Sequence, residues 1–177
     1  MEGIMLCTNA ELVRTLYVAL QTYDLADMFD RMSPRIRIQQ DERLPWGGAY
    51  RGYDGVRRFL ERLVLSVDSR VDVADLVEAG DTVVAIGRLR GQVRATGADF
   101  EAHLVHVWTV RQGRLIGLDA HLDMAPMLAA LGEPGPCAAG PATRADSRSG
   151  RSERGVTARG RGQWRVKRAA ALARVAS

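Results

Sequence analysis

The sequence predicts an α+β domain in which helices are segregated on one face of a curved antiparallel sheet. Three helical patterns come first, and four consecutive strand patterns joined by short turns follow them. The composition then changes after Gly132, where Pro, Gly, Ala and Arg replace most of the large apolar residues. We therefore expect one folded domain over residues 8–132 and a disordered Arg/Gly/Ala-rich tail over residues 133–177.

Capping patterns mark the first two helices. Thr8 and Glu11 have the spacing of a capping box, which predicts a helix that ends near Thr22. Asp24 is expected to cap a second, short helix, which Ser33-Pro34 ends because the residue before a proline avoids helical geometry.

Alternation and turn residues predict the remaining elements. Residues 35–40 alternate with period two, which indicates a strand with Ile36, Ile38 and Gln40 on its inner face. The later elements are expected in this order: a loop over residues 41–52, a helix capped by Asp54, strands over 71–78, 82–94, 100–110 and 115–123, and a short helix over 124–131 with Gly132 as its C-cap.

The last hairpin yields the first candidate site residue. Residues 111–113 are typical of a three-residue loop, which would pair Val110 with Arg114 and His106 with Leu118. In that register the inner face of the hairpin is apolar except for His106. A neutral imidazole in such a place can donate a hydrogen bond or accept a proton, or it can be a core histidine bonded to the backbone.

Charge is distributed unevenly along the chain. Residues 133–177 contain ten Lys or Arg against three acids, a net charge of +7, whereas residues 1–132 contain 15 Arg against 18 acids, a net charge of −3. A basic tail can attract nucleic-acid phosphates, but the interpretation as an extension without a role is favoured. We therefore expect no nucleic-acid partner.

The sequence contains no sign of membrane insertion, export or cofactor binding. No run approaches the roughly 20 apolar residues of a membrane span, and the N-terminus lacks the basic start of a signal peptide. Cys7 and Cys137 are isolated, and Trp46-Gly47-Gly48 matches neither a P-loop nor a dinucleotide fingerprint. We expect a cytoplasmic protein without metal or cofactor.

Several segments, in order and spacing, resemble SnoaL-like proteins of the nuclear transport factor 2 and ketosteroid isomerase superfamily. The resemblance extends over about residues 10–131 and is carried by residues 44–60, 80–85, 106–111 and 113–114. It implies a cystatin-like, cone-shaped antiparallel sheet wrapped on the N-terminal helices. A pocket is then expected where the loop before the third helix meets the sheet.

The resemblance also implies positions for catalytic groups. The isomerase's oxyanion-hole acid falls at His106, which can donate a hydrogen bond too. The isomerase's carboxylate base falls at Gln40, which cannot accept a proton, and Asp41 is the next residue along. The phenol donor of the first helix falls at Leu16, beside Tyr17.

The residues at the positions that the resemblance implies leave two functions open. The first is a cofactor-independent polyketide cyclase or isomerase that acts on an apolar, ketone-containing substrate, with His106 and Asp41 as catalytic residues. The second is a non-catalytic protein that binds an apolar small molecule, which the missing carboxylates favour. The expected substrate-binding residues are Tyr17, Gln40, Trp46, Trp108, Leu118 and Leu122.

One strand also predicts self-association. Residues 83–86 are apolar on both faces of their strand, and Val105 and Val107 add to the outward side. Exposed apolar patches commonly mark interfaces. We therefore expect a homodimer.

Overall fold

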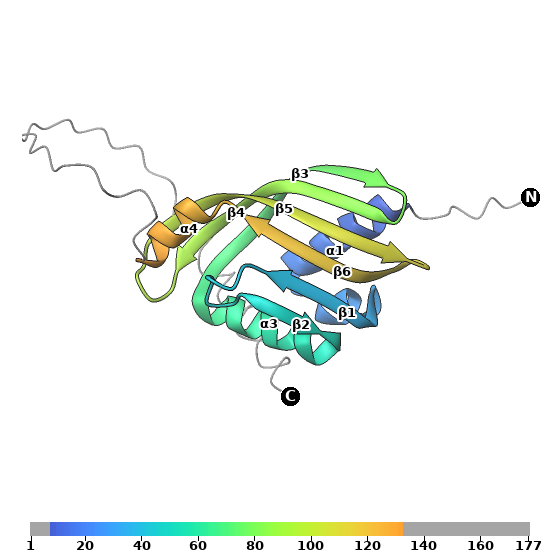
Figure 1. Ribbon diagram of the computed structural model, residues 1–177, viewed down its shortest axis with the longest axis horizontal. Coiled ribbons are helices and arrows are strands. Elements are labelled where there is room, and N and C mark those ends of the chain that lie inside the picture. The colour runs from blue at the N-terminus through green and yellow to red at the C-terminus, as the bar shows by residue number, and fades with distance from the viewer. Residues whose placement is uncertain (1–7, 133–177) are drawn as a thin grey trace, which may run out of the picture.

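The computed structural model describes residues 8–132, which form a mixed α+β domain with a curved, unclosed sheet (Figure 1). The predicted tail over residues 133–177 lies outside the described residues. The helices are α1 (Asn9–Thr22), α2 (Leu25–Asp30), α3 (Gly52–Ser66) and α4 (Met124–Leu131). The strands are β1 (Met32–Gln40), β2 (Gly48–Arg51), β3 (Val67–Ala79), β4 (Thr82–Val93), β5 (Asp99–Arg111) and β6 (Arg114–Leu122).

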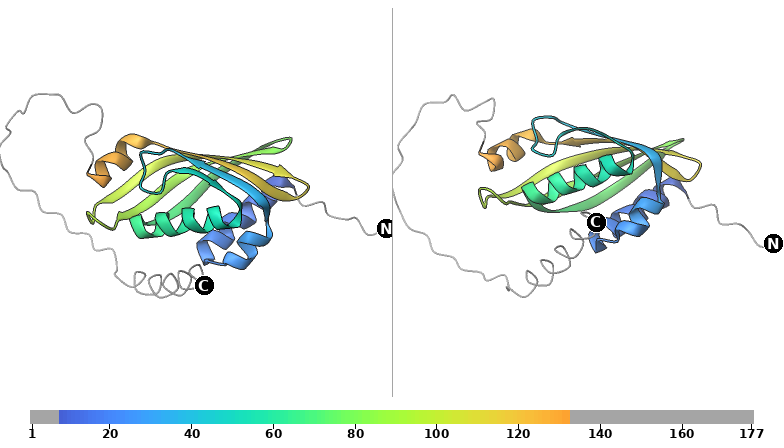
Figure 2. Two further views of the ribbon diagram at one scale, coloured as in Figure 1. Left: turned by 60° about the horizontal axis from the view of Figure 1, so that its bottom comes forward. Right: turned by 90° about the horizontal axis from the view of Figure 1, so that it is seen from below.

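The sheet has six strands in the order β2-β1-β6-β5-β4-β3, and β1 runs parallel to β6 while the other neighbours are antiparallel. Helices α1 and α3 lie on its concave face (Figure 2). α1 packs mainly on β3, and α3 packs mainly on β1 and β2. None of the described helices is long and apolar enough to cross a membrane.

The capping box expected at the start of α1 is confirmed by the structure. The Thr8 hydroxyl accepts from the Glu11 backbone N–H at 3.1 Å, and the Glu11 carboxylate accepts from the Thr8 N–H at 2.9 Å. The buried face of the helix is Val13, Leu16, Tyr17 and Ala19. Tyr17 is therefore held against the sheet by its own helix.

Several expected boundaries differ from the structure. α2 ends at Asp30 and β1 begins at Met32, so Ser33-Pro34 lies in the strand and does not end the helix. The expected loop over residues 41–52 contains β2, which pairs with β1 so that Tyr50 lies beside Ile38. α3 begins at Gly52, and Asp54 lies in its first turn without capping it, since Arg51 is the N-cap and makes no side-chain cap bond. A four-residue strand gains its stability from its neighbour, so its own sequence signal is weak.

The predicted register of the last hairpin is wrong by two residues, although the faces agree. The turn has two residues, Gln112 and Gly113, with φ of 49° and 67°, which is the left-handed backbone of a type I′ turn. Beyond a bulge near Thr109, His106 pairs with Ala120 rather than Leu118. A shift of two residues keeps each side chain on its face, and His106 stays on the concave side.

Two glycines of β4 allow the sheet to curve tightly. A Cβ at Gly87 would lie 2.2 Å from the Asp72 carbonyl oxygen, and one at Gly91 would lie 2.1 Å from the Asp68 carbonyl oxygen. Both glycines share a face with the buried Val83, Ala85 and Leu89. β3 therefore folds over the inner edge of β4 where no side chain intervenes.

Candidate functional site

Three side chains from α1 and β5 form a hydrogen-bonded chain on the concave face. The Trp108 indole N–H donates to the Tyr17 hydroxyl oxygen at 2.9 Å, and that oxygen lies 2.8 Å from Nδ1 of His106. If the hydroxyl proton did not go to Nδ1, it would have no acceptor among the described residues. The network therefore favours Nδ1 as acceptor and leaves the imidazole proton on Nε2.

Burial sets the charge of this network. His106 lies deep in the domain yet keeps part of its surface accessible, and burial lowers its pKa to about 4, with a smaller contribution from His121. Burial also raises the pKa of Tyr17, an effect that the hydrogen bond from Trp108 partly offsets. At neutral pH the network is neutral, and His106 presents an N–H donor at Nε2.

The lowered pKa predicts a pH dependence of stability. An unfolded histidine has a pKa near 6.5, so between about pH 6.5 and 4 the unfolded chain binds more protons than the folded one. We expect the free energy of unfolding to fall by up to about 3 kcal/mol as the pH drops through this window. Urea denaturation from pH 7 to 4 measures it.

The matched variant for this measurement is His106→Gln, which keeps an acceptor for Tyr17 and a donor but does not titrate. Its stability is expected to fall less than that of the wild type over the same window. Equal slopes for the two proteins would contradict the assignment of a neutral, buried His106. Asp41 adds to the loss of stability at the lower end of this window, because its pKa is about 2 in the folded state while the unfolded carboxyl begins to bind protons below about pH 5. Asp41 is present in both proteins, so its contribution cancels in the comparison.

Gln40 and Asp41 are neighbours in the chain but have different surroundings. Gln40 is 4 % exposed at the end of β1, and its amide nitrogen has no hydrogen-bond partner among the described residues. Asp41 pairs with Arg43 at 2.7 Å, and hydrogen bonds from the Arg43 side chain and backbone lower the pKa of Asp41 to about 2. The described residues show no contact between Asp41 and His106.

The other expected site residues are mostly buried in the core. Trp46 is 1 % exposed, and the Tyr50 hydroxyl donates to its carbonyl oxygen at 2.8 Å. Leu118 is buried opposite Trp108, and Leu122 is partly buried opposite Leu104. The structure thus brings Tyr17, His106 and Trp108 into direct contact and places Gln40, Leu118 and Leu122 on the same face of the sheet.

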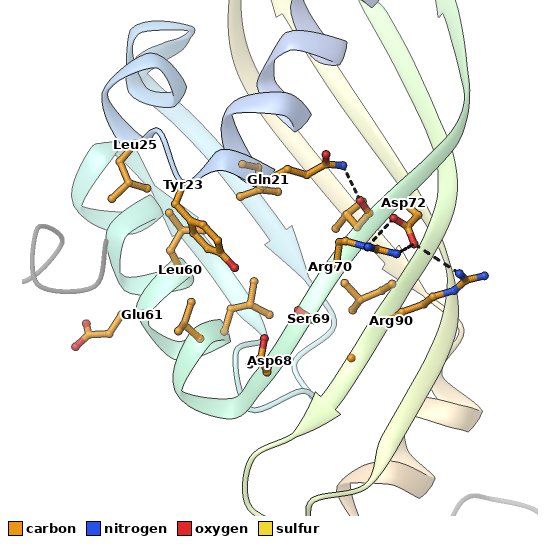
Figure 3. Close-up of a pocket in the computed structure, with 16 residues that line it drawn as sticks. Gln21, Tyr23, Leu25, Leu60, Glu61, Asp68, Ser69, Arg70, Asp72 and Arg90 are labelled. Atoms are coloured by element: carbon orange, nitrogen blue, oxygen red, sulfur yellow. Dashed lines mark hydrogen bonds and ion pairs between the residues drawn. The ribbon is translucent and has the colours of Figure 1, made fainter. Parts of the chain in front are cut away.

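A separate cavity of about 500 Å³ opens between the end of α1, the start of α2, the second half of α3 and strands β3 and β4 (Figure 3). Its volume lies within the usual range for small-molecule sites. The aliphatic part of its wall consists of Leu20, Leu25, Leu60, Leu63, Val64, Val71 and Leu89. None of the eight residues predicted from the sequence lines it.

The charged groups at the cavity's β3 edge are already paired. Arg70 lies 2.9 Å from Asp72, and Arg90 bridges Asp72 at 3.8 Å and Glu101 at 2.9 Å. Figure 3 shows Asp72 between Arg70 and Arg90 beside the cavity, with Gln21 reaching from α1 to the backbone of β3. Paired charges leave the apolar wall as the main feature that a ligand would meet.

The structure also bears on metal binding. Within residues 8–132, no three His, Cys, Asp or Glu side chains are grouped so that they could hold a metal ion.

A glycine on the inner face of a strand, such as Gly91, is the one sequence signal that could have located the cavity.

The family model of the SnoaL-like domain matches residues 13–117. The chain belongs to the SnoaL-like family. An NTF2-like protein from Burkholderia thailandensis is 31% identical to this SnoaL-like domain, with a TM-score of 0.65, over 69% of this chain and 95% of that protein.

Two further structures share the fold of this SnoaL-like domain. A SnoaL-like polyketide cyclase from Jannaschia is 20% identical, with a TM-score of 0.63, and covers 72% of this chain and 93% of its own. TerC, crystallised with polyporic acid, is 21% identical, with a TM-score of 0.64, and covers 70% of this chain and 97% of its own. None of the curated proteins matches this chain.

Proposed function

We propose that this SnoaL-like domain binds an apolar, ketone-containing small molecule and promotes its enolisation, as a cofactor-independent polyketide cyclase or isomerase does. The hydrogen-bonded chain from Trp108 through Tyr17 to His106 carries the proposal. It holds an N–H donor in a neutral, buried setting, where a hydrogen bond to a developing oxyanion is stronger than in water. The polyketide cyclase from Jannaschia shares the fold in which this donor is placed.

The cavity supplies space for the apolar body of the ligand. Its floor at Leu89 lies on the same face of β4 as Ala85, which pairs with His106. Gly87 lies between Leu89 and Ala85 and has no side chain. A ligand seated at Leu89 therefore lies on the same face of the sheet as His106.

The chemistry follows from the state of His106. The Nε2–H donates to the ketone oxygen and stabilises the enolate that forms when a proton leaves the neighbouring carbon. That proton passes to water, because Gln40 stands at the position of the isomerase base and Arg43 holds Asp41. Each step uses a neutral imidazole, in agreement with a pKa of about 4.

Deuterium exchange tests this function without knowledge of the natural substrate. The probe is 1-tetralone, an apolar bicyclic ketone, in D₂O, with incorporation of deuterium beside the carbonyl followed by NMR. We expect the wild type to accelerate the exchange and Leu63→Trp, which fills the cavity, to abolish the acceleration. Leu65→Trp is the control, because Leu65 is 66% exposed on the same helix.

A binding protein without chemistry is the second candidate, and the absence of a free carboxylate beside His106 favours it. It predicts that 1-tetralone binds to the wild type, and less to Leu63→Trp, while the exchange rate equals that of buffer. Failure of the ketone to bind at all would contradict both candidates.

We also propose that two copies of the domain pair through the outer face of the sheet. Val77, Ile86 and Val105 are 48%, 42% and 37% exposed, and Ile86 lies directly beside Val105 in the sheet. We expect light scattering at micromolar concentration to give a dimer mass for the wild type and a monomer mass for Ile86→Arg. Val18→Arg, at a 55% exposed position on α1, is expected to stay dimeric. A monomeric wild type would refute this pairing.

A further inference from the structure

Gln40 is the one buried polar residue of the described core. Gln40 is 4 % exposed, and its amide nitrogen is enclosed and has no hydrogen-bond partner among the described residues. Buried amides without partners are rare in folded proteins and destabilise them, so this one requires an explanation.

The sheet places Gln40 in one row with His106. Gln40 pairs with Ala120 across β1 and β6, and Ala120 pairs with His106 across β6 and β5. The backbones of β1 and β5 are therefore about 9.5 Å apart, twice the spacing of neighbouring strands. The residue between them, Ala120, has only a methyl side chain, so no long side chain of β6 separates Gln40 from His106 in this row.

The orientation of His106 supports a shared space. Its Nδ1 faces the Tyr17 hydroxyl of α1, and α1 packs on β3 and β4, on the far side of β5 from Gln40. Nε2 lies on the other side of the ring and is directed away from α1. The free donor of His106 and the free amide of Gln40 thus flank the same small residue.

We propose that Gln40 and His106 form a two-donor site that binds a ligand with two acceptor oxygens, such as a diketone. This inference rests on the proposed function, in which His106 donates to one ketone oxygen of the ligand. It adds a second ligand oxygen, which the Gln40 amide binds. Gln40 provides the amide N–H and His106 the imidazole N–H, and the apolar remainder of the ligand extends toward the cavity. In the absence of ligand the Gln40 amide stays unpaired, which lowers the stability of the free protein.

The first arm of the test measures stability without ligand. Gln40→Met has a side chain of similar length without hydrogen-bonding groups, and Gln40→Leu is a second variant in case the first packs poorly. We expect the melting temperature to rise by about 3 °C or more, because an unsatisfied buried group is removed. Gln39→Met is the matched control, since Gln39 is exposed on the opposite face, and its melting temperature is expected to stay unchanged.

The second arm compares two probes with the same ring system, 1-tetralone and 2-acetyl-1-tetralone, by calorimetry. We expect the wild type to bind the diketone about tenfold more tightly than the monoketone, the effect of one added hydrogen bond. Gln40→Met should lose this preference, whereas Gln39→Met should keep it.

The outcomes separate this inference from the proposed function. A lower melting temperature in both Gln40 variants would show that the amide is satisfied, for example by an ordered water, and would overturn the two-donor site alone. An equal preference for the diketone in wild type and Gln40→Met would overturn it as well. If neither probe binds to the wild type, the ketone ligand of the proposed function is wrong. The two-donor site for a diketone is then wrong as well.

Discussion

His106→Leu is expected to reduce the deuterium exchange of bound 1-tetralone by about 10²- to 10³-fold, the usual effect of removing one donor to an oxyanion. Leucine removes both the donor at Nε2 and the acceptor at Nδ1 that holds Tyr17. His106→Gln is expected to stay within about tenfold of the wild type, because an amide can copy both roles. NMR measurement of the exchange rate at saturating ketone provides the comparison.

The glutamine variant distinguishes a donor from a base. If His106→Gln loses as much rate as His106→Leu, by about 10²- to 10⁴-fold, the imidazole transfers a proton and the donor role is wrong. His103→Leu controls for general effects, because His103 is exposed on the outer face of the same strand. Melting temperatures of all three variants show whether a lost rate reflects a lost fold.

Gly91→Ala is expected to destabilise the domain by about 3 kcal/mol, a large part of the stability of a domain of this size. The new Cβ would lie 2.1 Å from the Asp68 carbonyl oxygen and 2.7 Å from the Ser69 Cα. Both contacts are to backbone, so β3 must move away from β4 to admit a methyl group. Urea denaturation measures the loss, and the melting temperature is expected to fall by about 10 °C.

Gly117→Ala is the matched control for this prediction. Gly117 also lies in a strand, but its Cβ would be 3.5 Å from the nearest atom, the Thr109 hydroxyl oxygen, which is ordinary contact. Its stability is expected to change by less than about 1 kcal/mol and to rise if at all, because alanine restricts the unfolded chain. Similar losses in the two variants would show that the close approach of β3 does not depend on Gly91.

Much of the fold could be predicted from short stretches of sequence. The capping box at Thr8 and Glu11 located α1, and period-two alternation placed Ile36, Ile38 and Gln40 on one face of β1. The same alternation put His106 on the concave face, and that assignment survived a two-residue error in register. These features depend on hydrogen bonds and side-chain directions within a few residues, which local sequence specifies.

The contacts that define the site were decided by the tertiary structure. The bond between Trp108 and Tyr17 joins residues 91 positions apart, and the parallel pairing of β1 with β6 places Gln40 two strands from His106. The cavity lies where α1, α2 and α3 meet β3 and β4, with Gly91 in its wall. No local pattern encodes these distances, because they follow from how the packed helices and the curved sheet share one core. The sequence by itself determined that Gln40 and His106 face inward. The tertiary structure decided which groups they contact there.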